Sequence, residues 1–188
     1  MFMRVIAGTA RGRRLKSVPG DSTRPIMDSV KENLFNILGD WVRGSRWIDL
    51  FAGTGSVGIE ALSRGADYCL FLDTSRAAIQ TINENLRAAR LGKGAIVRRA
   101  DALLMLQSSP VEEERVEVVY VAPPQHKQMW IESLELIDAR PQWLLPEGIV
   151  IIQIDPKEYQ PVNLERFNLY DERHYGNTLL CFYEKIED

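Results

Sequence analysis

The chain has 188 residues, of which 45% are hydrophobic, and a formal net charge of −3. This length allows one well-filled core and is short for two. No apolar stretch approaches the roughly 20 residues of a membrane span, and arginines stand where a signal peptide would be apolar. We therefore expect a soluble, cytoplasmic, monomeric protein with no membrane partner. Cys69 and Cys181 stand in apolar runs, which predicts buried free thiols rather than a disulfide.

The charge is divided unevenly, so the net negative value does not by itself exclude a nucleic-acid partner. Residues 1–24 contain six basic residues and one acid, a net +5, whereas the remainder contains 17 basic and 25 acidic residues, a net −8. Arg4–Gly8 and Arg13–Lys16 look like two short strands around a turn, which would hold arginines on one face. Such a segment is either a solvated surface or a nucleic-acid contact. The candidate contacts are Arg11, Arg13, Arg14, Lys16 and Arg24.

The middle of the chain has the pattern of a parallel sheet. Apolar residues after Pro25 recur at helical spacing as far as Leu38, and Gly39 supplies a stop. From residue 46, short apolar runs alternate with helical patterns, as βαβα units do. The expected strands are 47–51, 69–72, 95–97 and 116–121, and the expected helices are 57–63, 77–89, 102–106 and 130–137.

The C-terminal part contains strand-like runs without helices between them. The runs are 149–154, 167–170 and 179–183, and a turn at 175–177 separates the last two. This spacing predicts an antiparallel hairpin at the edge of the sheet. The acidic run 112–114 is expected to be a solvated loop. We divide the chain into an N-terminal hairpin and helix, residues 1–40, and a main domain, residues 41–188.

A glycine-rich loop follows the first strand of the main domain. The sequence Asp49–Gly58 contains the pattern GxGxxG where a strand gives way to a helix. Glycines there let the backbone turn tightly and approach a nucleotide-like ligand. The pattern alone also fits a merely tight turn. Asp73, 20 residues after Gly53 at the end of the next strand, could accept hydrogen bonds from both ribose hydroxyls, so the pair predicts an adenosine-type cofactor.

Two classes of cofactor use such a loop. Dinucleotides present a pyrophosphate, which favours a loop without negative charge, whereas S-adenosylmethionine presents a cationic amine and a sulfonium. Asp49, just before the glycines, suits the cation. Asp101 follows the third strand, where it could accept from an adenine amine. Each acid alone could instead be a helix cap or a solvated residue.

The fourth strand leads into Val121-Ala122-Pro123-Pro124-Gln125, and here the sequence resembles class I S-adenosylmethionine-dependent methyltransferases. Within them it is similar to the bacterial 16S rRNA guanine-N2 methyltransferases. The resemblance covers nearly the whole chain. The segments that carry it are RVIAGTARGRRLK, STRPIMDSVKENLFNIL, DLFAGTGSVGIEALSRGA and RHYGNTLLCFYE.

This resemblance implies a Rossmann-like α/β fold. Its mostly parallel seven-stranded sheet has helices on both faces and an antiparallel C-terminal hairpin, and a small N-terminal β-hairpin and helix precede it. The resemblance also implies that the basic hairpin and Arg24 engage rRNA, free or in an assembling 30S particle, and that a guanine is turned out of its stack. The implied cofactor is S-adenosylmethionine, and the implied cofactor-binding residues are Asp49, Phe51, Ala52, Gly53, Gly55, Asp73, Asp101 and Ala102.

The chain departs from the family pattern in the segment expected to bind the methyl acceptor. Amino-methyltransferases of this class usually carry Asp or Asn, then Pro-Pro, then an aromatic; the first residue accepts from the target amine and the aromatic stacks on the base. Ala122 and Gln125 occupy these positions. The candidate catalytic segment is Ala122, Pro123, Pro124 and Gln125. Gln125 could supply an amide oxygen, and His126 or Trp130 a flat stacking surface.

Three functions remain open on sequence alone. The first is methyl transfer to a guanine amine of small-subunit rRNA. The second is a cofactor-binding or RNA-binding protein that has lost catalysis, which Ala122 would permit. The third, a nicotinamide dehydrogenase, rests only on the glycine loop and Asp73. A metal site is not expected, because the two histidines and two cysteines lack ligand-like spacing.

Overall fold

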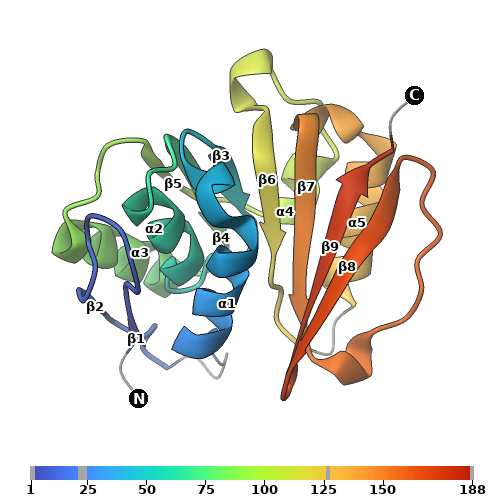
Figure 1. Ribbon diagram of the computed structural model, residues 1–188. Helices are drawn as coiled ribbons and strands as arrows, with labels where there is room; N and C mark the ends of the chain where they lie inside the picture. The colour runs from blue at the N-terminus through green and yellow to red at the C-terminus, as the bar shows by residue number, and fades with distance from the viewer. Residues whose placement is uncertain (1–2, 21–24, 126–127, 187–188) are drawn as a thin grey trace.

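The computed structural model describes residues 3–20, 25–125 and 128–186. A seven-stranded sheet has the strand order β5-β4-β3-β6-β7-β9-β8, and a separate two-stranded sheet pairs β1 with β2 (Figure 1). The α/β fold class expected from the sequence is confirmed, including the antiparallel C-terminal strands and the small N-terminal hairpin.

The elements have the following bounds. The strands are β1 Met3–Arg4, β2 Arg14–Leu15, β3 Arg46–Asp49, β4 Tyr68–Asp73, β5 Ala95–Arg99, β6 Val116–Val121, β7 Leu144–Ile154, β8 Phe167–Tyr175 and β9 Thr178–Lys185. The helices are α1 Asp28–Leu38, α2 Ser56–Ser63, α3 Arg76–Ala89, α4 Ala102–Leu106 and α5 Met129–Ala139. The 3₁₀ turns are η1 Gly39–Val42, η2 Glu112–Glu114, η3 Pro141–Trp143 and η4 Pro156–Glu158.

Strands β3 to β7 run parallel, and β9 returns antiparallel between β7 and β8. The carboxyl ends of the parallel strands therefore meet at one edge of the sheet. Strand β3 lies between β4 and β6, so the chain builds the sheet outward in both directions from β3. Ligands in open α/β sheets bind in the crevice at such a switch point.

Each face of the sheet is covered by its own group of helices (Figure 1). Apolar residues of α1, α2 and α3 form one cluster with residues of the sheet, and those of α4 and α5 form the other. Residues of the N-terminal hairpin, among them Val5 and Leu15, join the first cluster. Cys69 and Cys181 are buried free thiols, as expected, and burial raises the pKa of Cys69 well above its ordinary value. No helix in the three described ranges is long and apolar enough to span a membrane.

Several boundaries differ from the sequence expectation. Strands β1 and β2 pair over two residues each, because the backbone amides of Ile6 and Ala7 donate to the side chain of Glu60 rather than to a strand. Strand β7 begins at Leu144, before the expected start at residue 149, and its register with β6 shifts between Val116 and Val118. The acidic run expected as a loop is the 3₁₀ turn η2.

Candidate active site

The switch point lies where the carboxyl ends of β3, β4 and β6 meet. Asp49, the last residue of β3, is paired with Phe71 of β4 on one side and with Tyr120 of β6 on the other. The next backbone amide, that of Leu50, donates to the carbonyl of Tyr120 over 3.0 Å. The amide of Ala52 donates to the carbonyl of Leu72 over 2.8 Å. The loop after β3 is thus anchored to both neighbouring strands.

The glycine loop reaches its conformation through two left-handed residues. Gly53 has φ of 52° and Gly55 has φ of 76°, values that side chains disfavour. A Cβ at Gly53 would have no atom within 4 Å, so this backbone borders open space, whereas a Cβ at Gly55 would lie 3.2 Å from Ile82. The loop therefore offers backbone that a ligand can approach closely.

Asp73 is joined directly to this loop. Its Oδ2 accepts a hydrogen bond of 2.9 Å from the amide of Gly53, and its Oδ1 accepts one of 2.8 Å from the amide of Ser75. Each carboxylate oxygen can accept more than one hydrogen bond, so the half-buried side chain retains capacity for ligand hydroxyls. The structure thus brings Gly53 and Asp73 together, as the spacing in the sequence suggested.

Asp49 is almost completely buried beneath the loop, with 2% of its surface exposed. Burial raises the pKa of its carboxyl to about 7, a backbone hydrogen bond from Gly58 lowers the pKa, and the charge of Asp73 raises it. Its Oδ1 has no hydrogen-bond partner among the described residues. A buried carboxylate with an unused oxygen is stabilised by a cationic ligand. The carboxyl of Asp49 therefore fits the amine and sulfonium of S-adenosylmethionine better than it fits a pyrophosphate.

The other candidate cofactor-binding residues differ in their burial. Asp101 caps α4, because its Oδ1 accepts from the amides of Leu103 and Leu104 at 2.9 and 3.2 Å. This is the cap that the sequence left open as an alternative, and its exposed carboxylate still borders the carboxyl edge of the sheet. Ala52 and Ala102 are buried, and Phe51 is half-buried against the second hydrophobic cluster.

The candidate acceptor loop follows β6. Ala122, Pro123 and Pro124 are half-buried, whereas Gln125 is exposed. His126 lies outside the described residues. Trp130 is fully buried and stacks on Tyr159 with ring centroids 6.3 Å apart. The structure therefore excludes Trp130 as a surface for stacking a base, because its ring belongs to the core.

Sequence reasoning missed two polar residues beside this loop. The hydroxyl of Tyr120 on β6 donates a hydrogen bond to Oε1 of Gln153 on β7. Because Val121 is paired with Ile152, the parallel register places Ala122 next to Gln153. The only signal in the sequence is a glutamine that interrupts the apolar run of β7, and its neighbour across the sheet becomes known only from the strand order.

The N-terminal hairpin is attached to α2 and α3 by buried polar side chains. Glu60 accepts from the amides of Ile6 and Ala7 at 2.8 and 3.0 Å, and also forms an ion pair with the fully buried Lys31 at 3.5 Å. Asn85 accepts from the amide of Lys16 at 2.7 Å and donates to the carbonyl of Thr54 in the glycine loop at 2.9 Å. The side chain of Asn85 thus holds both the hairpin and the glycine loop.

The basic residues of the hairpin differ in their surroundings. Arg11, Arg13 and Arg14 are exposed. Lys16 is exposed as well, and its Nζ lies 2.8 Å from a carboxylate oxygen of Glu84. Arg24 lies outside the described residues. The exposed arginines leave a cationic surface on this hairpin, which is compatible with phosphate contacts.

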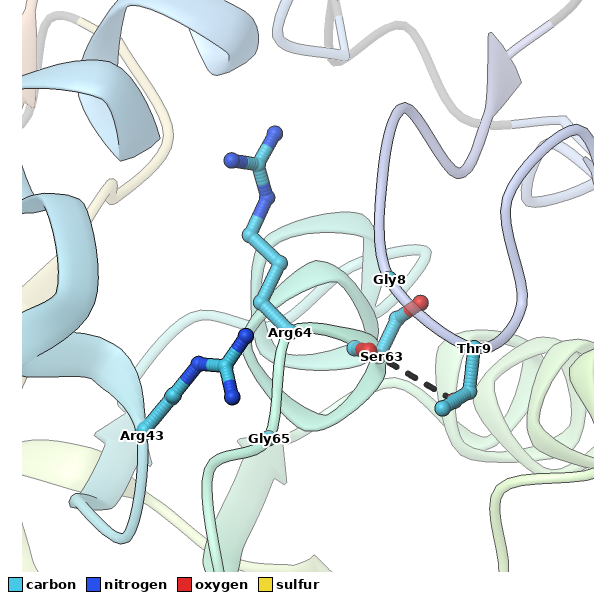
Figure 2. A pocket seen from close by; sticks show the side chains of 6 residues that line it. All are labelled: Gly8, Thr9, Arg43, Ser63, Arg64 and Gly65. Carbon is cyan, nitrogen blue, oxygen red and sulfur yellow. Dashed lines mark hydrogen bonds between the residues drawn. The ribbon is translucent and has the colours of Figure 1, made fainter.

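A separate hollow of about 500 Å³ lies where the hairpin meets the end of α2 (Figure 2). It is lined by Gly8, Thr9, Arg43, Ser63, Arg64 and Gly65. Arg43 precedes β3, and Ser63, Arg64 and Gly65 precede β4. The hollow therefore lies at the amino ends of these strands, opposite the glycine loop. Arg64 is paired with Glu60 at 2.8 Å and lies over the ring of Phe35. We therefore interpret the hollow as a packing feature rather than the reaction site. Within the described ranges, no group of three or more His, Cys, Asp or Glu could hold a metal ion.

Comparison with known proteins supports a common family. The family model described as "Conserved hypothetical protein 95" matches residues 3–184. The chain is 40% identical over 183 residues to the Bacillus subtilis "Putative rRNA methyltransferase YlbH", covering 97% of this chain and 99% of that protein. It is 30% identical over 182 residues to "Ribosomal RNA small subunit methyltransferase D" of Haemophilus influenzae, covering 97% and 93%.

A solved structure has the same architecture. The "Putative methyltransferase yhhF" from Escherichia coli superposes with a TM-score of 0.83 at 29% identity, and 98% of each chain is covered. The similarity therefore includes the N-terminal hairpin as well as the large sheet.

Proposed function

Because the chain belongs to the conserved hypothetical protein 95 family and is similar to relatives named for rRNA methylation, we propose that it transfers a methyl group from S-adenosylmethionine to small-subunit rRNA. The acceptor is the exocyclic N2 of a guanine. The observation that carries the cofactor assignment is the buried carboxyl of Asp49, with its unpartnered oxygen, under a glycine loop that Asp73 supports.

Asp49, Asp73 and the glycine loop would each bind a different part of the cofactor. Asp49 compensates the positive charge of the methionine part, and Asp73 accepts from the ribose hydroxyls. The backbone at Gly53 borders the space that the cofactor would fill. When bound, S-adenosylmethionine supplies a methyl group already attached to a good leaving group, so the protein contributes alignment, proximity and exclusion of water.

The exposed arginines of the N-terminal hairpin support an rRNA-facing role for residues 1–40, with residues 41–188 as the methyltransferase domain. Replacing Arg11 and Arg13 by glutamine should weaken RNA binding and reduce the slope of log K against log salt by up to about 2. Cofactor affinity should not change. The exposed Arg76 and Arg87 of α3 provide a matched double control. An unchanged salt slope would assign the hairpin arginines to a solvated surface.

The direct test is label transfer. Purified protein is incubated with methyl-labelled S-adenosylmethionine and small subunits that lack the modification, and the labelled nucleotide is identified by digestion and mass spectrometry. We expect N2-methylguanosine. Label on another base or position would refute the acceptor assignment. A parallel reaction with free rRNA shows whether the substrate is free rRNA or an assembled particle.

Ala122 favours one second candidate, a protein that binds cofactor or RNA without catalysis, because its side chain offers no acceptor. Cofactor binding without label transfer would support this candidate. The dehydrogenase alternative is tested by thermal stabilisation, since a ligand at 100 times its dissociation constant adds about 2.7 kcal/mol. Stabilisation by a dinucleotide but not by S-adenosylhomocysteine would overturn the proposal.

A further inference from the structure

The carboxyl edge of the sheet carries polar side chains on three neighbouring strands. Asp49 ends β3, Tyr120 is paired with it on β6, and Gln153 lies on β7. Tyr120 and Ile151 belong to the hydrophobic cluster on the α1 face, and Ala122 packs against the same cluster. Because side chains alternate along a strand, Tyr120, Ala122 and Gln153 all face this side of the sheet.

Gln153 has hydrogen-bonding capacity left after its contact with Tyr120. Its Oε1 accepts from the Tyr120 hydroxyl, which uses one of the two lone pairs and orients the carboxamide. Its Nε2 has no hydrogen-bond partner among the described residues, and the side chain is half-buried. Beside Ala122 the carboxamide therefore keeps one acceptor site on Oε1 as well as the donors of Nε2.

We propose that Gln153, held by Tyr120, supplies the hydrogen-bond acceptor that Ala122 lacks and so aligns the target amine. This inference rests on the proposed methyl transfer. The remaining lone pair of Oε1 accepts one N–H of the exocyclic amine, which directs the nitrogen lone pair toward the methyl carbon. A carbon–nitrogen bond forms while the carbon–sulfur bond breaks and its electron pair remains on sulfur. The methylated nitrogen then loses a proton to water, because a carboxamide is too weak a base to take it.

The test compares kcat, KM for small subunits and affinity for S-adenosylhomocysteine. Gln153→Leu removes the acceptor and should lower kcat by about 10²-fold to 10³-fold, as loss of one positioned polar contact does. KM and cofactor affinity should change little, because neither depends on this hydrogen bond. Gln142→Leu is a matched control, since Gln142 is also half-buried with one side-chain hydrogen bond, of 3.2 Å to Ser109.

Restoring an acceptor after β6, the neighbouring strand, tests whether Gln153 aligns the target amine or only stabilises the fold. Adding Ala122→Asn to Gln153→Leu returns an acceptor to the same edge and should recover at least a tenth of the wild-type kcat. Tyr120→Phe releases the carboxamide without removing it and should lower kcat by about 2-fold to 10-fold. It also supplies an answer if Gln153→Leu does not fold.

The outcomes distinguish failure of this inference from failure of the proposed function. Absence of label transfer by the wild-type protein refutes the function itself. Transfer by the wild type together with a kcat of Gln153→Leu within threefold of it overturns only the role of Gln153. A loss that Ala122→Asn does not restore also overturns it, and so does an unchanged kcat in Tyr120→Phe when the leucine variant is unfolded.

Discussion

Asp49→Asn should stabilise the protein and weaken its binding of a cationic cofactor at the same time. The carboxyl is buried, and burial raises its pKa to about 7 from an ordinary value of 3.8. A folded state that prefers the protonated form loses stability as pH rises from the unfolded pKa to the folded pKa. Asparagine is neutral at every pH, so this loss does not occur in the variant.

The size of the effect follows from the two pKa values. At 1.36 kcal/mol for each pH unit, the difference between 3.8 and about 7 corresponds to about 4 kcal/mol at pH 8. At pH 5 the unfolded carboxyl is already ionised whereas the folded one is not, and the variant should gain about 2 kcal/mol. At pH 3 both states are protonated and the gain should vanish.

Urea unfolding at pH 3, 5 and 8 measures the free energy of unfolding of each protein. Asp40→Asn is the control, because the side chain of Asp40 is fully exposed. Calorimetry with S-adenosylmethionine at pH 8 should show weaker binding by Asp49→Asn. A stability gain independent of pH, or cofactor affinity equal to that of the wild type, would refute the argument that an ionised, buried Asp49 is retained for a cationic ligand.

Two further predictions concern the support of the glycine loop. Asn85→Ala should lower the free energy of unfolding by about 3 kcal/mol, because it leaves the part-buried backbone of Lys16 and the buried carbonyl of Thr54 unpaired. A loss equal to that of the exposed control Asn83→Ala would contradict this. Gly58→Ala should cost about 1–3 kcal/mol in urea unfolding, since its Cβ would lie 2.3 Å from the Phe71 ring. Gly92→Ala, which meets no atom within 4 Å, should be nearly neutral, and equal stabilities of the two variants would show that α2 can move away from β4.

The local parts of the site could be read from the sequence because their signals lie within a few residues. The change from an apolar run to glycines and then to a helical pattern marks the turn between β3 and α2. Gly53 and Asp73 are separated by one helix and one strand, so the βαβ unit brings them together, as their 2.9 Å hydrogen bond confirms. Asp101 illustrates the limit of such signals, because the same residue at a strand end also caps α4.

The contacts between distant segments could not be read in this way. Trp130 follows the acceptor loop closely in sequence, yet its ring points into the core on the α5 side. The short pairing of β1 with β2 is explained by Glu60, more than 50 residues away, which takes the amides a longer strand would have used.

The sequence by itself determined the order of strands and helices, the glycine loop and the acids at the strand ends, because hydrophobic periodicity and turn chemistry are local. Only the tertiary structure decided which strands are neighbours and which faces they share. Gln153 lies beside Ala122, and Asn85 joins the hairpin to the glycine loop, because the parallel register and helix packing bring together residues about 30 or more positions apart. The polar groups that could complete the acceptor site are therefore visible only in the folded chain.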